Sequence, residues 1–246
     1  MVADAHFLAV DAGNTRVKWA LHGARGWESS GSIATAEIDS LESAWTRLPT
    51  VSRAFACNVA GEDVQRAIER ACAAKGASLV LLTSQAEQLG VVNGYLDPAQ
   101  LGADRWVALV AAHANGHGHK LVVNAGTALT IDALEDGGRF AGGLIIPGPA
   151  LMRASLTRAT AGLRLTEGRY ADFPASTPDA ITSGALQAGV GAIERMRRKM
   201  EAAGIAPLIV LLSGGAAGEL APHLSMPFSI YENLVLDGIA LIARAS

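Results

Sequence analysis

The stretch Phe7-Leu-Ala-Val-Asp11-Ala-Gly-Asn-Thr15 joins an apolar run of strand type to a turn of small and polar residues. The same order returns about half a chain later, where Leu121-Val-Val123 leads into Asn124-Ala-Gly-Thr-Ala-Leu-Thr130. Taken alone, either copy can be a hairpin turn stabilised by Asn and Gly. A hairpin turn has no reason to recur in the same strand context at this distance. The repeat therefore predicts two similar halves that face each other across a bound nucleotide.

The two turns have the residue types that bind phosphate. Gly13 and Gly126 let the backbone approach an anion closely and offer N–H donors where a Cβ would intrude. The hydroxyls of Thr15, Thr127 and Thr130 can add donors to phosphate oxygens. We therefore interpret both turns as phosphate-binding turns.

The first turn also has two charged residues. A carboxylate such as Asp11 repels phosphate, so beside a phosphate site we expect it to hold Mg²⁺ or the waters of that ion. Lys18 offers a mobile positive charge to the same phosphates. The first turn thus predicts a site for Mg²⁺ and a nucleotide.

Composition narrows the classes of protein to consider. The chain has 246 residues, of which 50% are hydrophobic, and this suits one large domain or two half-sized domains. Its formal charge of −3 does not indicate the excess of basic residues that nucleic-acid binding requires. A basic run at 195–199 lies between two glutamates, so a solvated helix face is the better interpretation. Cys57 and Cys72 are too few for a disulfide framework, and no apolar run has the length of a membrane span. We expect a cytoplasmic protein without membrane or nucleic-acid partners.

Apolar periodicity and turn residues predict the same order of elements twice, strand-strand-strand-helix-strand-helix. The order predicts an α/β fold with mixed sheets and a cleft between the halves. The boundary is expected at His113 to His119, giving domains at 1–115 and 116–246. A metal site formed by His113, His117 and His119 is disfavoured, because glycines make the segment flexible and no Cys, Asp or Glu lies within it. The expected strands are 6–10, 16–21, 31–35, 52–57, 79–82, 120–123, 129–134, 139–146 and 208–212, and the expected helices are 38–48, 64–75, 106–114, 182–203 and 233–245.

Residue types suited to proton transfer lie between the two turns. Gly102-Ala-Asp104-Arg105 precedes an apolar helix, where N–H groups and the positive end of the helix dipole also point. Asp104 can accept the proton of an attacking alcohol, and Arg105 can bind a substrate carboxylate through two hydrogen bonds. The structural alternative is a helix-capping aspartate followed by an exposed arginine.

With these segments in order, the chain resembles the type III pantothenate kinases, a family within the actin, Hsp70 and sugar-kinase superfold. Each matching segment is weak alone, whereas their order and spacing together are specific. The resemblance implies two duplicated actin-like, ribonuclease H-like domains with mixed five-stranded sheets and an interdomain cleft. The segments are Asp11-Ala-Gly-Asn-Thr-Arg-Val-Lys18, Gly102-Ala-Asp-Arg105, Asn124-Ala-Gly-Thr127, Gly142-Gly-Leu-Ile-Ile-Pro-Gly148, Thr177 with Ser183-Gly184, Ser213-Gly-Gly215 and Asn233-Leu-Val-Leu-Asp-Gly238.

The resemblance implies ATP-dependent phosphorylation of pantothenate, the first step of coenzyme A biosynthesis, with Mg²⁺. Asp104 is implied as the general base, and Thr127 as an ATP contact of the second turn. The family is homodimeric, and Thr177 resembles a threonine that reaches pantothenate from the partner subunit. The implied first phosphate loop comprises Asp11, Ala12, Gly13, Asn14, Thr15, Arg16, Val17 and Lys18. The implied pantothenate site comprises Tyr95, Gly102, Ala103, Asp104, Arg105 and Thr177.

One position departs from the family pattern. Many relatives have aspartate at the opening of the second turn as a ligand for a monovalent cation such as K⁺ or NH₄⁺, and this chain has Asn124. An amide oxygen coordinates a cation without the charge of a carboxylate, so we expect weak binding at most. The hypothesis is that K⁺ dependence is reduced or absent.

The sequence leaves alternatives for three further features: the glycines of the long helix, the glycine-rich turns and the competing functions. Gly184, Gly189 and Gly191 fit either a dimer interface or packing inside one subunit. The glycine-rich end at 213–218 is expected to border the adenosine, and the turns within 142–148 are either near the substrate or purely structural. A kinase for another small hydroxyl compound and a non-catalytic accessory protein are the competing functions.

Overall fold

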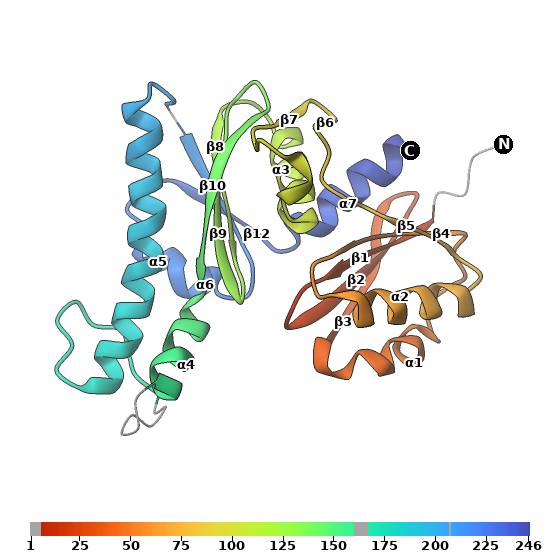
Figure 1. The fold of residues 1–246 in the computed structure, drawn as a ribbon, viewed down its shortest axis with the longest axis horizontal. Coiled ribbons are helices and arrows are strands. Elements are labelled where there is room, and N and C mark those ends of the chain that lie inside the picture. Colours follow the sequence, from red (N-terminus) through yellow and green to blue (C-terminus); the bar gives the residue numbers. More distant parts are fainter. Residues whose placement is uncertain (1–5, 160–166, 207) are drawn as a thin grey trace. The chain divides into compact units, whose positions relative to one another are not determined.

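Two units make up the chain in the computed structural model, which describes residues 6–159, 167–206 and 208–246 (Figure 1). The first runs to Ala114 and includes Leu234–Ser246, and the second spans Asn115–Asn233. The final helix, expected in a C-terminal domain of 116–246, therefore lies in the first unit. The chain passes from the first unit to the second after Ala114.

The first unit is built on a mixed five-stranded sheet with the order β3-β2-β1-β4-β5. β1 pairs antiparallel with β2 and parallel with β4. Its strands are β1 (Phe7–Ala12), β2 (Arg16–Gly23), β3 (Gly26–Ala34), β4 (Arg53–Asn58) and β5 (Ser78–Leu81).

Helices cover both faces of this sheet. α1 (Leu41–Trp45) and α2 (Glu62–Ala74) pack on one face, where the Trp19 and Trp45 rings meet edge to face at 6.1 Å. The buried residues of α2 recur at helical spacing, and burial of each large apolar side chain contributes about 1.5–3 kcal/mol. The remaining elements of this unit are the 3₁₀ helices at Thr35–Ser40 and Pro98–Gln100, the antiparallel strands β6 (Glu87–Gln88) and β7 (Val91–Asn93), and the helices α3 (Ala103–Ala114) and α7 (Leu234–Ala245).

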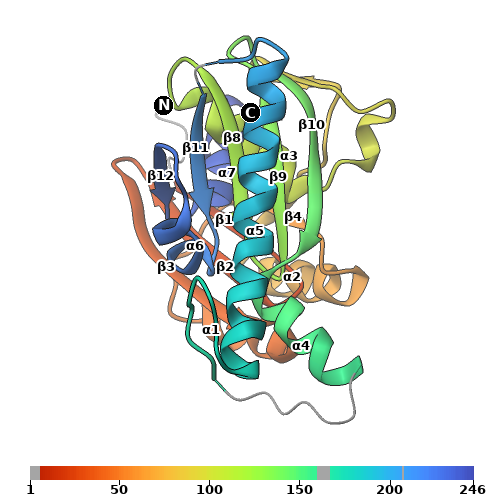
Figure 2. The ribbon, with the colours of Figure 1, turned by 90° about the vertical axis from the view of Figure 1, so that its left-hand side faces the viewer.

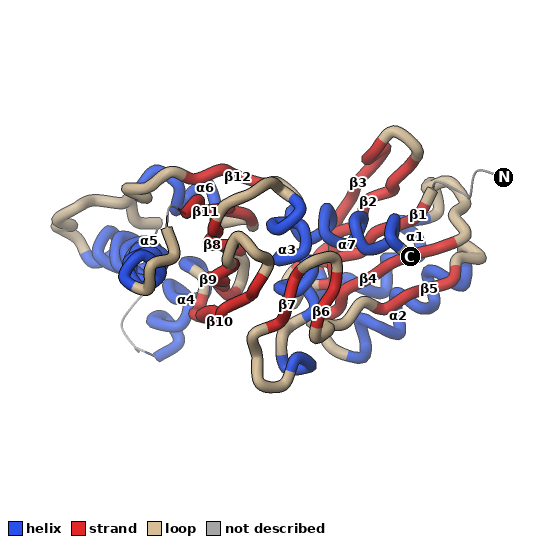
Figure 3. Tube along the Cα trace, turned by 90° about the horizontal axis from the view of Figure 1, so that it is seen from above, coloured by secondary structure: helices blue, strands red, loops and turns tan. Residues whose placement is uncertain are grey.

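α7 lies along the other face of the sheet and contacts β1, β2 and β4 (Figure 3). α3 packs against α7 so closely that a Cβ on Gly238 would lie 1.9 Å from the Val107 carbonyl oxygen. Gly238 therefore permits a helix contact that any other residue would block. This contact explains why the last segment of the chain belongs with the first unit.

The second unit repeats the first sheet strand for strand. Within this unit the order is β12-β11-β8-β9-β10, which matches β5-β4-β1-β2-β3, and β8 is likewise antiparallel to one neighbour and parallel to the other. The duplicated α/β fold expected from the repeated turn is confirmed. Its strands are β8 (His119–Ala125), β9 (Ala128–Leu134), β10 (Arg139–Pro147), β11 (Leu208–Ser213) and β12 (Phe228–Tyr231).

The long helix α5 (Thr177–Ala202) packs against β8 and β9 of this sheet (Figure 2). It begins five residues before the expected start, because Ser176 caps it through the Asp179 N–H at 3.3 Å and Pro178 fits its first turn. The other helices of the unit are α4 (Pro149–Ala159), α6 (Ala217–Leu220) and a 3₁₀ helix at Ala221–His223.

Several elements differ from the sequence-based expectation, among them the short strands β6 and β7 and the short helix α6, which were not expected. The helix expected at 38–48 is a 3₁₀ helix at Thr35–Ser40 followed by the short α1. The helix α4 and the edge strand β12 were not expected. Over the part of the chain that is described, no helix is long and apolar enough to cross a membrane.

Candidate active site

Asp11 stands near the end of β1, between partners on both neighbouring strands. The strand register places it opposite Lys18 of β2 and Cys57 of β4, so the three side chains share one face of the sheet. Cys57 is fully buried, and its Sγ lies 3.6 Å from Asp11 Oδ1 in a thiol-to-carboxylate hydrogen bond. The sequence analysis did not identify Cys57, because only the strand pairing brings it beside the carboxylate.

Hydrogen bonds hold the backbone of the turn after β1, and the side chains at its tip are exposed to solvent. The Gly13 N–H donates to the Arg16 carbonyl at 3.1 Å, and Thr35 Oγ1 donates to the Gly13 carbonyl at 2.8 Å. A Cβ on Gly13 would lie 3.3 Å from the Arg16 oxygen, so this position favours glycine for space. Asn14, Thr15 and Arg16 are exposed. A ligand can therefore approach a loop that is already ordered.

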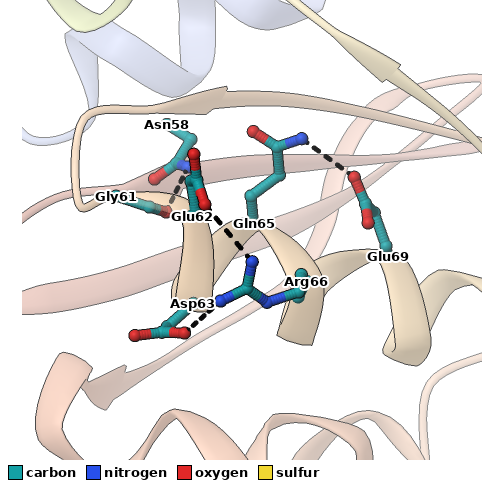
Figure 4. A network of polar contacts seen from close by, with 7 residues as sticks. All are labelled: Asn58, Gly61, Glu62, Asp63, Gln65, Arg66 and Glu69. Atoms are coloured by element: carbon teal, nitrogen blue, oxygen red, sulfur yellow. Dashed lines mark hydrogen bonds and ion pairs between the residues drawn. The ribbon is translucent and has the colours of Figure 1, made fainter.

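A second polar turn lies directly beside the first. The Val59 N–H donates to the Ala12 carbonyl at 3.0 Å. Asn58 closes this second turn by donating to the Gly61 carbonyl at 2.9 Å and accepting from the Ala60 N–H at 2.9 Å (Figure 4). The start of α2 is then held by exposed contacts of Arg66 with Glu62 and Asp63, each worth well under 1 kcal/mol. The Val59 N–H therefore connects the end of β4 to the start of the first turn, and Asn58 holds the shape of the turn that follows β4.

The first turn of α3 holds Asp104 and Arg105. Gly102 precedes this helix, and its carbonyl accepts the first helical hydrogen bond, from the Trp106 N–H at 3.0 Å. Asp104 Oδ1 accepts from the Arg105 N–H at 2.8 Å, and a Cβ on Gly102 would approach that oxygen to 2.7 Å. Ala103, the first residue of the helix, has no functional side-chain group. The glycine thus leaves room for the carboxylate.

Arg105 is buried, with 5% of its surface exposed. This excludes the alternative of a capping aspartate followed by an exposed arginine. Its Nη1 donates to the Tyr95 hydroxyl at 3.0 Å, and its guanidinium lies 5.7 Å from the centroid of the Tyr95 ring. Asn93 fixes the Tyr95 segment by accepting from the Tyr95 N–H at 3.0 Å and donating to the Pro98 carbonyl at 3.3 Å. The arginine and tyrosine expected at one site are therefore in contact.

The electrostatics of this region favour a bound cation. The pKa of Asp11 is raised to about 6, by burial first and then by the nearby Asp104 carboxylate, while Lys18 and the Cys57 hydrogen bond oppose the shift. Burial also raises the pKa of Asp104, against the lowering effect of the Arg105 N–H and guanidinium. Burial and the two carboxylates raise the pKa of the Cys57 thiol well above its ordinary value. Two partly desolvated carboxylates with one lysine form a group whose charge Mg²⁺ would compensate.

The second unit places Asn124 at the matching position of its own sheet. The strand register sets Asn124 opposite Thr130 of β9 and Ser213 of β11. Gly214 has a φ of +95°, and a Cβ there would lie 2.6 Å from Asn124 Oδ1 and 2.5 Å from the Ala125 carbonyl oxygen. The glycine after β11 is therefore required both by its backbone conformation and by the close packing of Asn124.

Thr127 is exposed at the tip of the second turn. The Gly126 N–H donates to the Ala128 carbonyl at 3.0 Å, and the Gly148 N–H donates to the Thr127 carbonyl at 2.8 Å. A Cβ on Gly148 would lie 2.1 Å from the Gly126 carbonyl oxygen. The Pro147-Gly148 segment thus supports the second turn by packing on its backbone.

Thr177 is the first residue of α5 and is exposed. It lines an apolar groove of about 480 Å³ between α4 and α5, together with Met152, Leu156 and Gly184. In the first unit the structure brings together Asp11, Lys18, Tyr95 and the segment 102–105. The three residues of the second unit that were expected at the site lie on the second turn, Asn124 and Thr127, and at the start of α5, Thr177. Among the described residues, no cluster of three His, Cys, Asp or Glu side chains forms a candidate metal site.

The family model for the type III pantothenate kinases matches residues 7–199. The chain belongs to this family. A type III pantothenate kinase from Aromatoleum aromaticum is 46% identical over 237 residues, which cover 96% of this chain and 97% of that protein. Another from Nitrosospira multiformis is 45% identical over 238 residues, with coverage of 96% and 90%. This kinase family accounts for the order of motifs along the chain.

Solved structures support the fold at low sequence identity. MreB5 of Spiroplasma citri, solved with ADP, aligns with a TM-score of 0.54 at 10% identity and covers 98% of this chain and 96% of its own. The inorganic polyphosphate/ATP-glucomannokinase of an Arthrobacter species aligns with a TM-score of 0.51 at 16% identity, with coverage of 98% and 100%. Actin-like and sugar-kinase proteins therefore share the duplicated architecture of this pantothenate kinase family member.

Proposed function

We propose that this chain transfers the γ-phosphoryl group of ATP to the primary hydroxyl of pantothenate, giving 4′-phosphopantothenate and ADP. This is the first step of coenzyme A biosynthesis. The observation that carries the proposal is the pair Asp104 and Arg105 in one helical turn, with Arg105 buried against Tyr95. The pair offers a base for a hydroxyl and a cation for a carboxylate, and pantothenate has both groups.

Asp104 acts as the general base. It accepts the proton of the hydroxyl as that oxygen attacks phosphorus, while the bond from phosphorus to the ADP oxygen breaks. A raised pKa suits this role, because a carboxylate with a higher pKa is a stronger base. Arg105 and Tyr95 orient the substrate by binding its carboxylate, since the planar guanidinium can donate two parallel hydrogen bonds.

The segment from Asp11 to Lys18 binds the phosphates of ATP. Thr127 contributes a hydroxyl donor from the second unit. Backbone N–H groups of the ordered turn and the Lys18 ammonium donate to phosphate oxygens. Asp11 holds Mg²⁺ through its waters. When bound, this ion neutralises charge on the transferring phosphate.

The functional form is a homodimer in which Thr177 of one subunit reaches pantothenate in the other. The exposed Thr177 and the apolar groove beside it support this proposal. Of the three glycines on α5, Gly189 packs inside the subunit, where its Cβ would meet Leu220 at 3.1 Å. Gly184 and Gly191 have open space around them. They lie seven residues, or about two helical turns, apart on α5 and are available to a partner helix.

Because Asn124 stands at the opening of the second turn, the kinase activity depends only weakly on K⁺ or NH₄⁺, or not at all. Its amide oxygen is neutral and packs against Gly214. We expect activity in choline chloride to match activity in KCl at the same ionic strength. A steep activation by K⁺ over Na⁺ and choline would contradict this proposal.

An acceptor panel tests the activity. ADP release is measured with pantothenate, with the analogue that has CH₂OH in place of the carboxylate, and with glucose. Pantothenate is expected to be the best acceptor, and the analogue is expected to lose at least about tenfold in kcat/KM, because Arg105 would lose its charged partner. A preference for glucose would indicate a kinase for another hydroxyl compound, and no turnover with any acceptor would indicate an accessory protein.

A further inference from the structure

A second cavity lies at the opposite end of the first sheet from the Asp11 turn. β1 begins there at Phe7, β2 ends at Gly23 and β4 begins at Arg53. The cavity measures about 750 Å³, within the range of small-molecule sites. Asp11 lies four positions after Phe7 in β1, or about 13 Å along the strand. The cavity is therefore distinct from the proposed kinase site.

Three arginines line this cavity from three different elements. Arg25 lies between β2 and β3, Arg53 begins β4, and Arg244 lies in the last turn of α7. Among the described residues, none of the three guanidinium groups forms a hydrogen bond or an ion pair. The carboxylate beside Gly23 belongs to Glu28, and His6 Nε2 already contacts it at 3.2 Å. The cavity therefore has an excess of positive charge.

Next to the arginines, the rings of Phe7 and His22 form an aromatic wall. His22, Phe7 and Arg53 lie side by side in register across β2, β1 and β4. The His22 ring stacks on Phe7 at 4.8 Å with an interplanar angle of 6°, and Trp27 meets it edge-on at 5.0 Å. His22 Nδ1 is buried and has no hydrogen-bond partner within the described part of the chain. Burial and then the Arg244 charge lower the pKa of His22, in keeping with a positive potential.

We propose that this cavity binds an organic phosphate. Arg25, Arg53 and Arg244 hold the phosphate group, because guanidinium groups match phosphate oxygens in charge and in geometry. The His22 ring, backed by the buried Phe7 on which it stacks, forms the flat wall for the organic part. The ligand would also compensate the mutual repulsion of the three arginines, which no carboxylate among the described residues relieves by an ion pair.

Binding to the full-length protein tests the site with three probes, phenyl phosphate, inorganic phosphate and phenol, at constant ionic strength. Calorimetry gives the affinities, and side-chain ¹H–¹⁵N spectra of histidine report on His22. Phenyl phosphate is expected to shift the His22 resonances saturably, inorganic phosphate to bind at least about fivefold more weakly, and phenol not to bind, as expected for joint recognition of charge and ring.

Variants localise the site. Arg25 and Arg244 are exposed, so the double substitution Arg25→Gln, Arg244→Gln should leave the fold intact and weaken phenyl phosphate at least about tenfold. Arg70→Gln, on the exposed surface of α2, is the matched control and should not change binding.

Absence of a saturable His22 shift would overturn the proposal, and so would unchanged affinity in the double variant. If inorganic phosphate bound as tightly as phenyl phosphate, the result would contradict the proposed role of the aromatic wall in binding the organic part of the ligand. Phosphate held only by the Asp11 turn would leave the His22 resonances unmoved and would also overturn it. None of these readouts depends on kinase activity.

Discussion

Asp11 is a carboxylate in a place where folding alone would favour a neutral group. Its pKa is raised to about 6 by burial and then by Asp104. Between about pH 4 and pH 6 the folded state keeps a proton that the unfolded state releases, so stability falls as the pH rises through this window. The cost of the ionised form above pH 6 is on the order of 2 kcal/mol.

Asp11→Asn should therefore stabilise the ligand-free protein. We expect the free energy of unfolding in urea to rise by about 1–2 kcal/mol at pH 7.5 and to be unchanged at pH 4, where Asp11 is protonated. Kinase activity should be lost because the Mg²⁺ ligand is gone. Asp39→Asn, on an exposed carboxylate of the same unit, is the control. Equal stability of wild type and Asp11→Asn at pH 7.5 would contradict the burial of a charge at this position.

Cys57 and Cys72 form a matched pair for a second prediction. Both are buried, but only Cys57 contacts Asp11. Truncation of either to alanine should cost about 1 kcal/mol of stability through lost packing. Only Cys57→Ala should also raise the Mg²⁺ concentration needed for half-maximal activity, by about threefold, because Asp11 loses a hydrogen-bond donor that orients it. Equal Mg²⁺ dependence in both variants would assign Cys57 a packing role alone.

The sequence allowed prediction of the residues on the turns but not of their neighbours across the sheet. Asp11, Lys18, Asp104 and Arg105 stand in short segments with recognisable chemistry, and the structure brings them together in one unit. Cys57 reaches Asp11 only through the pairing of β1 with β4, 46 residues apart. No local pattern records such a contact.

At the scale of elements, the contact between α3 and α7 depends on Gly238. A Cβ there would meet the backbone of Val107 at the carbonyl oxygen, which cannot rotate away as a side chain can. Gly238→Ala should destabilise the protein by about 3 kcal/mol, as overpacking does. Gly218→Ala in α6 is the control, because its Cβ meets nothing within 4 Å and helix propensity favours alanine by up to about 1 kcal/mol. Unfolding curves that give the two variants equal stability would contradict the close packing of α3 and α7.

Periodicity predicted the elements that bury a regular face and missed those that do not. α2 and β8 were expected because their apolar residues recur at helical spacing or form a continuous run. β12 is a short edge strand with exposed Phe228 and Ile230, and so has no buried face to recognise. α7 was expected as a helix, but its place in the first unit depends on Gly238 and could not be derived from the pattern of α7 alone.

For the whole molecule, the proposed homodimer predicts subunit complementation. Asp104→Asn chains and Thr177→Val chains should each be nearly inactive as homodimers. In a mixed dimer, one site has both substitutions and the other has neither, so mixing should restore activity. The recovered activity should increase with the fraction of mixed dimers. No recovery after verified exchange of subunits would contradict a site shared between subunits.

In the proposed reaction, Asp104 accepts the proton of the attacking hydroxyl. Asp104→Asn keeps the size of the side chain and an oxygen that can accept from the Arg105 N–H, but it removes the base. Steady-state kinetics with pantothenate, combined with calorimetric binding of a non-hydrolysable ATP analogue, tests the claim directly. We expect kcat to fall by about 10²–10⁴-fold while the affinity for the nucleotide changes less than threefold. Near-normal kcat in Asp104→Asn would contradict the assignment of the base.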